Sequence, residues 1–350
     1  MKTIEVKAST AYCVHIGSGL LTSLGEQVRS VCAAEKVAIV SDTNVFPLHG
    51  QAAMLSLQNA GFDVVTFIFP AGEESKNSTV YLELLNFLAE NPLTRSDCLI
   101  ALGGGVVGDL TGFTAATYLR GISYVQVPTT LLAAVDSSVG GKTAIDLPAG
   151  KNLCGAFYQP CLVLCDTDTL NTLPAEVFLD GCAEVIKYGI LYDSALFAHL
   201  CEHGPDFHRE NVIARCVELK RNVVMEDEFD TGERMKLNLG HTIGHGIEAH
   251  SQFRISHGKA VGIGMCIVAK AASNNSICSE ETGNQIISAV KQFGLPTQTE
   301  FGAEQLMNSA LSDKKRAGGT VNLIVPAAIG DCRIHPIPVG ELKSFIEAGL

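Results

Sequence analysis

The sequence predicts an α/β fold in its first half and a mainly α-helical second half. Up to residue 174, short β-branched and apolar runs alternate with helix-like segments. Near-continuous apolar strands that alternate with helices are typical of a parallel sheet covered on both faces. Long helical patterns dominate the rest of the chain, whose 350 residues exceed the size that one hydrophobic core usually supports. We therefore predict two domains, residues 1–174 and 175–350.

The expected elements follow in order along the chain. Strands are predicted at residues 36–41, 63–69, 98–102 and 124–127, with helices at 20–31, 78–89 and 110–118. Pro174 lies just inside a helix start, after Asn171 and Thr172, and marks the domain boundary. The second half is predicted to contain helices at 175–203, 209–226, 234–250, 258–275 and 280–293, then a closing pair of strands at 320–325 and 332–337.

Bulk properties exclude several classes of protein. The net charge of −12 argues against a nucleic-acid partner, which requires a basic surface. No apolar run approaches the 18 residues or so that span a membrane, and the N-terminus lacks the apolar core of a signal peptide. The twelve cysteines are scattered and include no Cys-x-x-Cys, so a disulfide framework is not expected. We predict a cytoplasmic protein that binds neither nucleic acid nor membrane.

Glycine and polar residues follow several predicted strands. The run Gly-Gly-Gly-Val-Val-Gly-Asp at residues 103–109 leads from a strand into a helix, where backbone N–H groups can reach a pyrophosphate. Its spacing is not Gly-x-Gly-x-x-Gly, so a tight turn that only needs glycine remains an alternative. Asp42, residues 71–76 and residues 128–130 follow three other strands. Four strand ends of this kind favour a dinucleotide site and a Rossmann-like domain.

A second set of polar residues has helical spacing. A helix over 234–250 would place five polar side chains on one face, those of Arg234, Asn238, His241, His245 and Glu248. Glycines at 240, 244 and 246 weaken such a helix, which predicts a close approach of another backbone. Two histidines at i and i+4 can share a metal ion, and His257 could add a third ligand. The alternative is a solvated face with incidental histidines.

Glu184 and Lys187 lie three residues apart in an apolar helical segment. One interpretation is a local ion pair that stabilises the helix slightly. The other is a metal-binding carboxylate with a substrate-binding lysine one turn away. With His241 and His257, Glu184 would complete a set of two histidines and one carboxylate with an open coordination position.

Several segments of the chain resemble motifs of the 3-dehydroquinate synthase family, within the sugar-phosphate cyclases. The resemblance runs from near Asp42 to Lys315, and Gly-Lys-Asn at 150–152 with Gly-Ala-Phe-Tyr-Gln-Pro at 155–160 favours this family over other cyclases. The matching segments are residues 103–109, 128–133, 135–143, 150–153, 155–160, 183–189 and 237–245. The resemblance implies NAD+, a divalent metal (Zn²⁺ or Co²⁺) and a homodimer.

The resemblance also implies roles for individual residues. The metal ligands are Glu184, His241 and His257. NAD+ contacts are implied at Asp42, Ala71, Gly72, Glu73, Glu74, Ser75, Lys76, Gly105, Val106, Val107, Gly108, Asp109, Thr129, Thr130, Lys142, Lys151, Thr169, Leu170, Asn171 and Thr172. Substrate contacts are implied at Arg120, Asp136, Lys142, Asn152, Lys187, Lys220, Arg234, Asn238, His245 and one of the pair Lys314 and Lys315, of which we take Lys314.

Among these positions, Lys187, Arg234, Asn238 and His245 are the catalytic candidates, and His245 is the expected proton relay. Asp230 departs from the family pattern, in which we expect glutamate. The implied reaction turns 3-deoxy-D-arabino-heptulosonate 7-phosphate, a phosphorylated sugar acid, into 3-dehydroquinate and phosphate. Alternatives are a metal-dependent polyol dehydrogenase, another cyclase such as 2-deoxy-scyllo-inosose synthase, and a non-catalytic binding protein.

Overall fold

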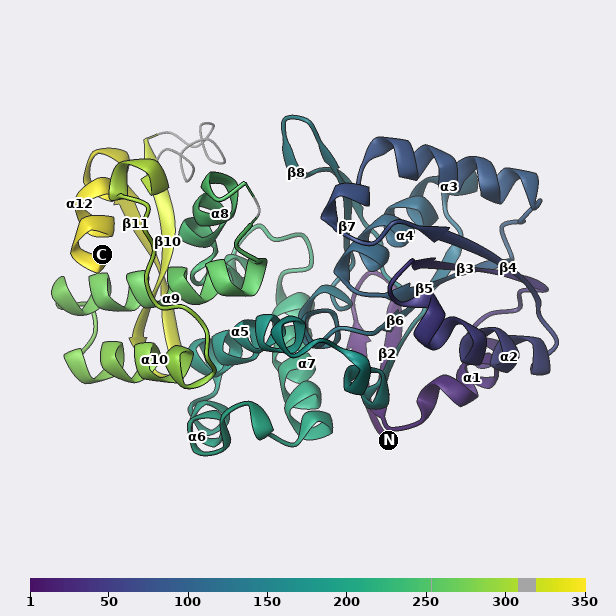
Figure 1. Ribbon diagram of the computed structural model, residues 1–350, viewed down its shortest axis with the longest axis horizontal. Helices are drawn as coiled ribbons and strands as arrows, with labels where there is room; N and C mark the ends of the chain where they lie inside the picture. The colour runs from purple at the N-terminus through teal and green to yellow at the C-terminus, as the bar shows by residue number, and fades with distance from the viewer. Residues whose placement is uncertain (253, 308–318) are drawn as a thin grey trace. The chain divides into compact units, whose positions relative to one another are not determined.

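The computed structural model describes residues 1–252, 254–307 and 319–350 (Figure 1). The chain forms two compact units. The first unit contains Met1–Pro174 and Arg209–Phe229, and the second contains Ala175–His208 and Asp230–Leu350. Among the described residues, no helix combines the length and apolarity needed to cross a bilayer.

The first unit is built on a seven-stranded sheet with the order β1-β2-β9-β6-β5-β3-β4. Its strands are β1 (Lys2–Lys7), β2 (Ala11–Gly17), β3 (Lys36–Asp42), β4 (Asp63–Phe69), β5 (Cys98–Gly103), β6 (Ser123–Pro128) and β9 (Leu162–Asp166). All neighbours pair in parallel except β1 and β2, which are antiparallel. The four strands predicted in this half are confirmed as β3 to β6.

Helices cover both faces of this sheet, as its continuous apolar strands predict. Helices α1 (Leu24–Val31) and α2 (Gln51–Asn59) pack on one face, and α3 (Ser78–Glu90) and α4 (Gly105–Thr117) pack on the other. Successive side chains of a strand point to opposite faces, so Leu99 joins the core under α3 and α4 while Ile100 joins the core under α1 and α2. The predicted α/β class is therefore confirmed.

Shorter elements complete the first unit. A hairpin of β7 (Lys142–Leu147) and β8 (Gly150–Phe157) lies against α4, and Gly112 allows this contact because a Cβ there would lie 2.4 Å from Thr143 Cγ2. The remaining short helices of this unit are η1 (Leu20–Ser23), η2 (Phe46–Gly50), η3 (Glu73–Ser75), η4 (Tyr118–Arg120), η5 (Ala133–Ser137) and η6 (Thr167–Thr172).

Helix α7 (Arg209–Glu226) belongs to the first unit, although the sequence prediction grouped it with the second half. It packs against β1, β2 and η5. Its buried side chains include Val212, Ile213, Val217 and Val224, which need an apolar partner surface. Strand β1, at one edge of the sheet, and its neighbour β2 supply that surface, and neither strand was predicted from the sequence.

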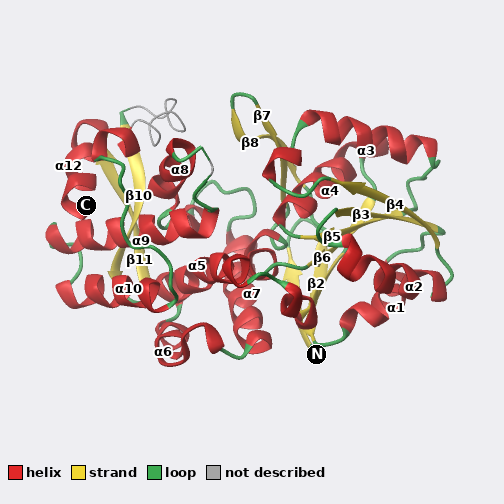
Figure 2. Cartoon of the chain, viewed as in Figure 1, coloured by secondary structure: helices red, strands yellow, loops and turns green. Residues whose placement is uncertain are grey.

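The second unit is mainly helical, with one hairpin of β10 (Thr320–Ala328) and β11 (Asp331–Pro338) (Figure 2). Helix α9 (His257–Asn274) packs against α5, α8, α10 and α12 and is buried along most of its length. Further helices of its described part are α5 (Ala175–Tyr192), α6 (Ser194–His203), α8 (His241–His250), α10 (Glu280–Gln292), α12 (Val339–Gly349) and the 3-10 turns η7 (Gly204–Asp206) and η8 (Glu233–Asn238).

Two predicted helices of this half are interrupted. The segment 175–203 forms α5 and α6, because the Asp193 side chain accepts hydrogen bonds from the amides of Ala195 and Leu196 and starts a new helix. The prediction of one helix over 234–250 is wrong. Residues 233–238 form the 3-10 turn η8, and Gly240, with a φ of 77°, redirects the chain before α8 begins at His241. The C-terminal helix α12 was not predicted.

Candidate active site

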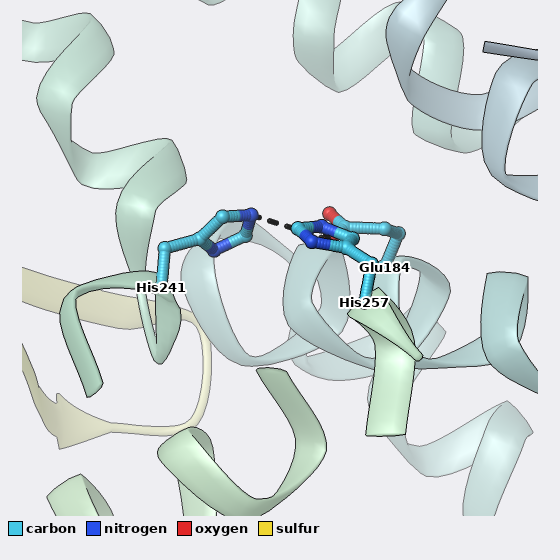
Figure 3. Close-up of side chains that lie close together, drawn as sticks. All are labelled: Glu184, His241 and His257. Carbon is cyan, nitrogen blue, oxygen red and sulfur yellow. Dashed lines mark ion pairs between the residues drawn. The ribbon is translucent and has the colours of Figure 1, made fainter. Parts of the chain in front are cut away.

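Three side chains predicted as metal ligands converge in the second unit. Glu184 lies in the middle of α5, and His241 and His257 are the first residues of α8 and α9. One carboxylate oxygen of Glu184, Oε1, lies 3.4 Å from the Nε2 atoms of both histidines. Figure 3 shows these two imidazoles directed at Glu184, which is fully buried. The three potential ligand atoms all lie within 4.8 Å of one another.

The surroundings of the two histidines differ. Nδ1 of His241 lies 3.1 Å from the carbonyl oxygen of Leu239, which can only accept, so Nδ1 carries the proton and Nε2 keeps its lone pair. Burial, helped by the positive charge of Lys187, lowers the pKa of His241 to about 3. Burial also acts to lower the pKa of His257, but Glu184 and Glu248 outweigh it and raise that pKa to about 10. His241 is therefore neutral without a metal ion, whereas His257 is protonated and has to release one proton before it can bind a metal.

These residues fit a divalent metal ion. A carboxylate and two imidazoles form a donor set typical of catalytic zinc sites, which leave one coordination position for water or substrate. Glu184 is 0% exposed, and a buried carboxylate requires a cation or several hydrogen-bond donors nearby. The second oxygen of Glu184, Oε2, contacts Nζ of Lys187, and Oε1 faces the two imidazoles.

A close contact between α5 and α9 fixes the position of His257. Asp180, one turn before Glu184, accepts a 2.5 Å hydrogen bond from Oγ of Ser256 and a 3.1 Å bond from the amide of Lys259. Gly258 allows this approach, because a Cβ there would lie 1.9 Å from the carbonyl oxygen of Asp180. Asp180 was not predicted as a site residue, although its i, i+4 spacing to Glu184 was visible in the sequence.

Glycines also bring α8 and α9 together, as predicted. A Cβ on Gly264 would lie 2.1 Å from the carbonyl oxygen of Gly240, and one on Gly244 would lie 3.1 Å from Ala260. Side chains larger than hydrogen would separate the two helices that carry His241 and His257. The expected close backbone approach is confirmed, and its partner is α9.

The catalytic candidates of the second unit have different environments. Lys187 is 1% exposed and Arg234 is 2% exposed, so both charges are buried, whereas His245 is exposed on α8. The ring of His245 lies 5.5 Å from the ring of His241. Arg234 and Asn238 belong to η8 and therefore do not share a helix face with His245. Lys187 forms the local ion pair with Glu184 that the sequence offered as one interpretation.

Most predicted nucleotide contacts of the first unit lie at the carboxyl ends of the strands, which we call the carboxyl edge of the sheet. Asp42 ends β3, residues 71–76 follow β4, Gly105 follows β5, Thr129 follows β6, and residues 169–172 follow β9. These five strands are parallel, so their carboxyl ends lie at the same edge. Ligands of open α/β sheets bind at that edge. The glycine run enters α4 directly, because α4 begins at Gly105 and not at the predicted residue 110.

Lys76 links three segments at this edge. Its Nζ lies 2.8 Å from Glu73, 3.3 Å from Asp109 and 3.8 Å from Asp146, and its side chain is 5% exposed. Burial raises the pKa of Asp109 to about 6, although Lys76 acts in the opposite direction. Lys151 lies 3.7 Å from the same Glu73. Four of the nucleotide candidates thus form one ionic cluster, namely Glu73, Lys76, Asp109 and Lys151.

The remaining candidates are distributed unevenly. Lys220 of α7 pairs with Asp136 of η5 at 2.8 Å, which brings two substrate candidates together in the first unit. Lys142 and Asn152 lie on the hairpin β7–β8. Arg120 lies elsewhere, after the C-terminus of α4, and its neighbour Leu119 accepts a hydrogen bond from Arg95 in the loop before β5. The structure therefore places Arg120 near the amino ends of the strands, whereas the candidate residues that follow β3, β4, β5, β6 and β9 lie at their carboxyl ends.

Three further positions complete the set. Asp230 has a φ of 58°, a left-handed conformation in which aspartate is enriched among residues other than glycine. This preference gives a physical reason for aspartate where the family pattern led us to expect glutamate. Lys314 and Lys315 lie outside the described residues.

Comparisons with known proteins decide the family. Residues 66–180 match the model of the 3-dehydroquinate synthase N-terminal domain, and residues 181–316 match the model of its C-terminal domain. A curated 3-dehydroquinate synthase of Streptococcus suis is 42% identical over 99% of this chain and 100% of its own. The chain belongs to the 3-dehydroquinate synthase family. A family member from Streptococcus pneumoniae is also 42% identical, with 96% of each chain covered.

Solved structures extend the family's fold to other enzymes. A 2-deoxy-scyllo-inosose synthase complexed with carbaglucose-6-phosphate, NAD+ and Co²⁺ has a TM-score of 0.89 and 25% identity, with all of both chains covered. The 2-epi-5-epi-valiolone synthase of Streptomyces hygroscopicus has a TM-score of 0.88 at 23% identity, covering 99% of this chain and 98% of its own. A glycerol dehydrogenase of Schizosaccharomyces pombe has a TM-score of 0.68 at 17% identity, covering 96% of this chain and 88% of its own. The 3-dehydroquinate synthase fold is thus shared with cyclases and, more distantly, with a polyol dehydrogenase.

Proposed function

We propose that the protein is a lyase that converts 3-deoxy-D-arabino-heptulosonate 7-phosphate into 3-dehydroquinate and phosphate, a step of the shikimate pathway towards chorismate and the aromatic amino acids. The observation that carries this proposal is the 42% identity to curated 3-dehydroquinate synthases over 99% of the chain. The cluster of Glu184, His241 and His257 supports it, because its donor set suits a catalytic divalent ion.

The proposed reaction is a transient oxidation of a ring carbinol, β-elimination of phosphate, re-reduction and an intramolecular aldol closure. NAD+ and a Zn²⁺ or Co²⁺ ion, when bound, supply the hydride acceptor and the Lewis acid. The ketone formed by the oxidation acidifies the neighbouring C–H, which allows phosphate to leave. Since the hydride returns to the substrate, the reaction consumes no external oxidant.

The residues of this chain would bind and orient the reactants. Glu184, His241 and His257 would hold the metal ion, and the segments at the carboxyl edge of the sheet would hold NAD+, including Asp42, residues 71–76, 105–109, 129–130, Lys142, Lys151 and 169–172. Lys187 and Arg234 would bind the anionic groups of the substrate, with Asn238 beside them, and His245 would transfer a proton. Asp136, Asn152, Lys220 and Lys314 are further proposed substrate contacts.

Redox balance tests the reaction. Purified protein given the heptulosonate phosphate, NAD+ and Zn²⁺ should release phosphate and 3-dehydroquinate in equal amounts, while absorbance by NADH stays flat at steady state. The physical reason is that the hydride returns to the carbon it left. Stoichiometric NADH would instead identify a dehydrogenase related to the polyol dehydrogenases.

The same assay separates the two cyclase activities. The TM-score of 0.89 favours 2-deoxy-scyllo-inosose synthase as a second candidate, but the 25% identity to it is far below 42%. Identification of the carbocyclic product from the substrate of each enzyme would decide between them. Failure to release phosphate from either substrate, with metal and NAD+ present, would favour a non-catalytic protein.

Removal of one ligand tests the metal site. Wild-type protein should bind about one divalent ion per chain. His257→Ala should bind it at least about tenfold more weakly, because removing a metal ligand lowers metal affinity at least as much as removing a hydrogen-bond partner of a ligand. Metal content after dialysis against a buffered zinc concentration measures this. His250→Ala, which removes an exposed histidine of α8, is the control and should bind normally. Undiminished zinc in His257→Ala would remove that residue from the site.

We further propose a homodimer in the cytoplasm. None of the twelve cysteines, all of which lie in the described residues, forms a disulfide, which suits a reducing compartment. Light scattering during gel filtration would test the dimer, since a mass near 37.1 kDa would indicate a monomer.

A further inference from the structure

Glu248 is a buried carboxylate of α8 to which the proposed reaction assigns no role. It is 3% exposed and lies one turn beyond His245. A buried carboxylate is costly unless a positive or hydrogen-bonding group faces it. One group that faces Glu248 is His257, whose Nδ1 lies 3.3 Å from Glu248 Oε2.

The two ring nitrogens of His257 face different carboxylates. Nε2 lies 3.4 Å from Oε1 of Glu184, and Nδ1 lies 3.3 Å from Oε2 of Glu248. A neutral imidazole has one N–H and one lone pair. A metal ligand must offer the lone pair, so the N–H has to lie on the opposite nitrogen. Glu248 accepts at Nδ1 and therefore favours the tautomer that presents Nε2 to Glu184.

His241 provides an internal comparison. Its Nδ1 faces the carbonyl oxygen of Leu239 at 3.1 Å, so a neutral acceptor fixes the same tautomer there. His257 receives a charged acceptor in place of a carbonyl. Hydrogen bonds to an ionised acceptor are about twice as strong as neutral ones and increase the basicity of the imidazole.

We propose that Glu248 is a positioning residue that holds His257 in the tautomer and orientation required to bind the metal ion. This inference rests on the proposed function, because it assumes that Glu184, His241 and His257 hold the ion. The competing possibility is a second cation site, since His245, Glu248 and His257 also bring potential ligand atoms within 4.8 Å of one another. A neutral His257 has only one lone pair and can serve only one of the two clusters.

Glu248→Gln tests this role, because the amide keeps the size of the side chain and removes its charge. We expect zinc affinity to fall about 10–100-fold, as is typical when an outer partner of a metal-bound histidine is lost. The absorption spectrum of the Co²⁺-substituted variant should also change, because the histidine ligand is no longer held in one orientation. The melting temperature of the metal-free protein should stay near the wild-type value. Glu280→Gln, an exposed carboxylate of the same unit, is the control and should bind metal normally.

Several outcomes would overturn the inference. One such outcome is a Glu248→Gln variant whose zinc affinity and Co²⁺ spectrum both equal those of the wild type. Another is a variant with an unchanged Co²⁺ spectrum whose zinc affinity falls together with the stability of the metal-free protein. Two ions per wild-type chain and one in the variant would make Glu248 a ligand. If Glu248→Gln does not fold, Glu248→Asp, which keeps the charge on a shorter side chain, should bind zinc with intermediate affinity; wild-type affinity there would contradict the role. Absence of metal binding by the wild type would refute the proposed metal site itself.

Discussion

Lys187→Met should lower kcat/KM at least about tenfold, equivalent to roughly 1.4 kcal/mol of transition-state stabilisation, in metal-loaded protein. Lys187 is 1% exposed, and its Nζ contacts Oε2 of Glu184. A divalent ion at Oε1 would neutralise that carboxylate, leaving the lysine charge available to an anionic substrate. Methionine retains most of the apolar packing of the lysine stem. Metal content and melting temperature of the loaded protein should therefore stay near wild-type values.

A matched substitution gives this measurement its control. Lys291 is an exposed lysine of α10, so Lys291→Met makes the same chemical change away from the site and should leave kcat/KM unaltered. Full activity of Lys187→Met would assign Lys187 a purely structural role as the partner of Glu184. Unfolding of the metal-loaded variant would lead to the same conclusion.

Gly258→Ala should weaken metal binding and destabilise the second unit. The new Cβ would lie 1.9 Å from the backbone oxygen of Asp180, and neither atom belongs to a flexible side chain. Helix α9 would have to move away from α5, separating His257 from Glu184. We expect the free energy of unfolding to fall by about 1–3 kcal/mol, the usual cost of overpacking. Zinc affinity should fall at least about tenfold, because the ligands no longer converge. Denaturant unfolding and zinc titration measure the two effects.

Gly262 provides a control on the same helix. A Cβ there would make an ordinary contact of 3.5 Å with Val290, so Gly262→Ala should be neutral or stabilise α9 by up to about 1 kcal/mol. Wild-type zinc affinity in Gly258→Ala would show that the approach of α5 and α9 does not determine the metal site.

Local sequence patterns predicted strands β3 to β6, which include the edge strand β4, but not β1, β2 or β9. Strands β3, β5 and β6 are buried along almost their whole length, and their sequences are mostly apolar runs followed by helical segments. Strand β1 is an edge strand that alternates exposed and buried residues, and its only strand partner is β2. The pairing of β2 with β9, which is distant in sequence, leaves no trace in the local pattern of either strand.

The i, i+4 spacing of His241 and His245 indicated a metal site, but the cluster joins His241 to Glu184 and His257, which lie outside that pattern and were assigned through the family resemblance. His241 and His245 are four residues apart, and both are on α8 as predicted. The extension of that helix back to Arg234 failed because Gly240 takes a left-handed conformation, which glycine permits but does not require. Arg120 was grouped with the other substrate candidates through family resemblance alone. The course of α4 across the sheet, from the carboxyl ends of the strands to their amino ends, shows that Arg120 lies near the amino ends.

The course of the chain around α7 limits how this protein can be divided. The polypeptide passes between the two units at 174/175, at 208/209 and at 229/230. Cutting after Pro174 would yield a fragment without α7 and would expose the apolar surface of β1 and β2 that α7 covers. Because each unit consists of two separate stretches of the chain, neither unit can be expressed or exchanged as one continuous segment. An independently folding first unit would need α7 reattached by a designed linker, as in a circular permutant.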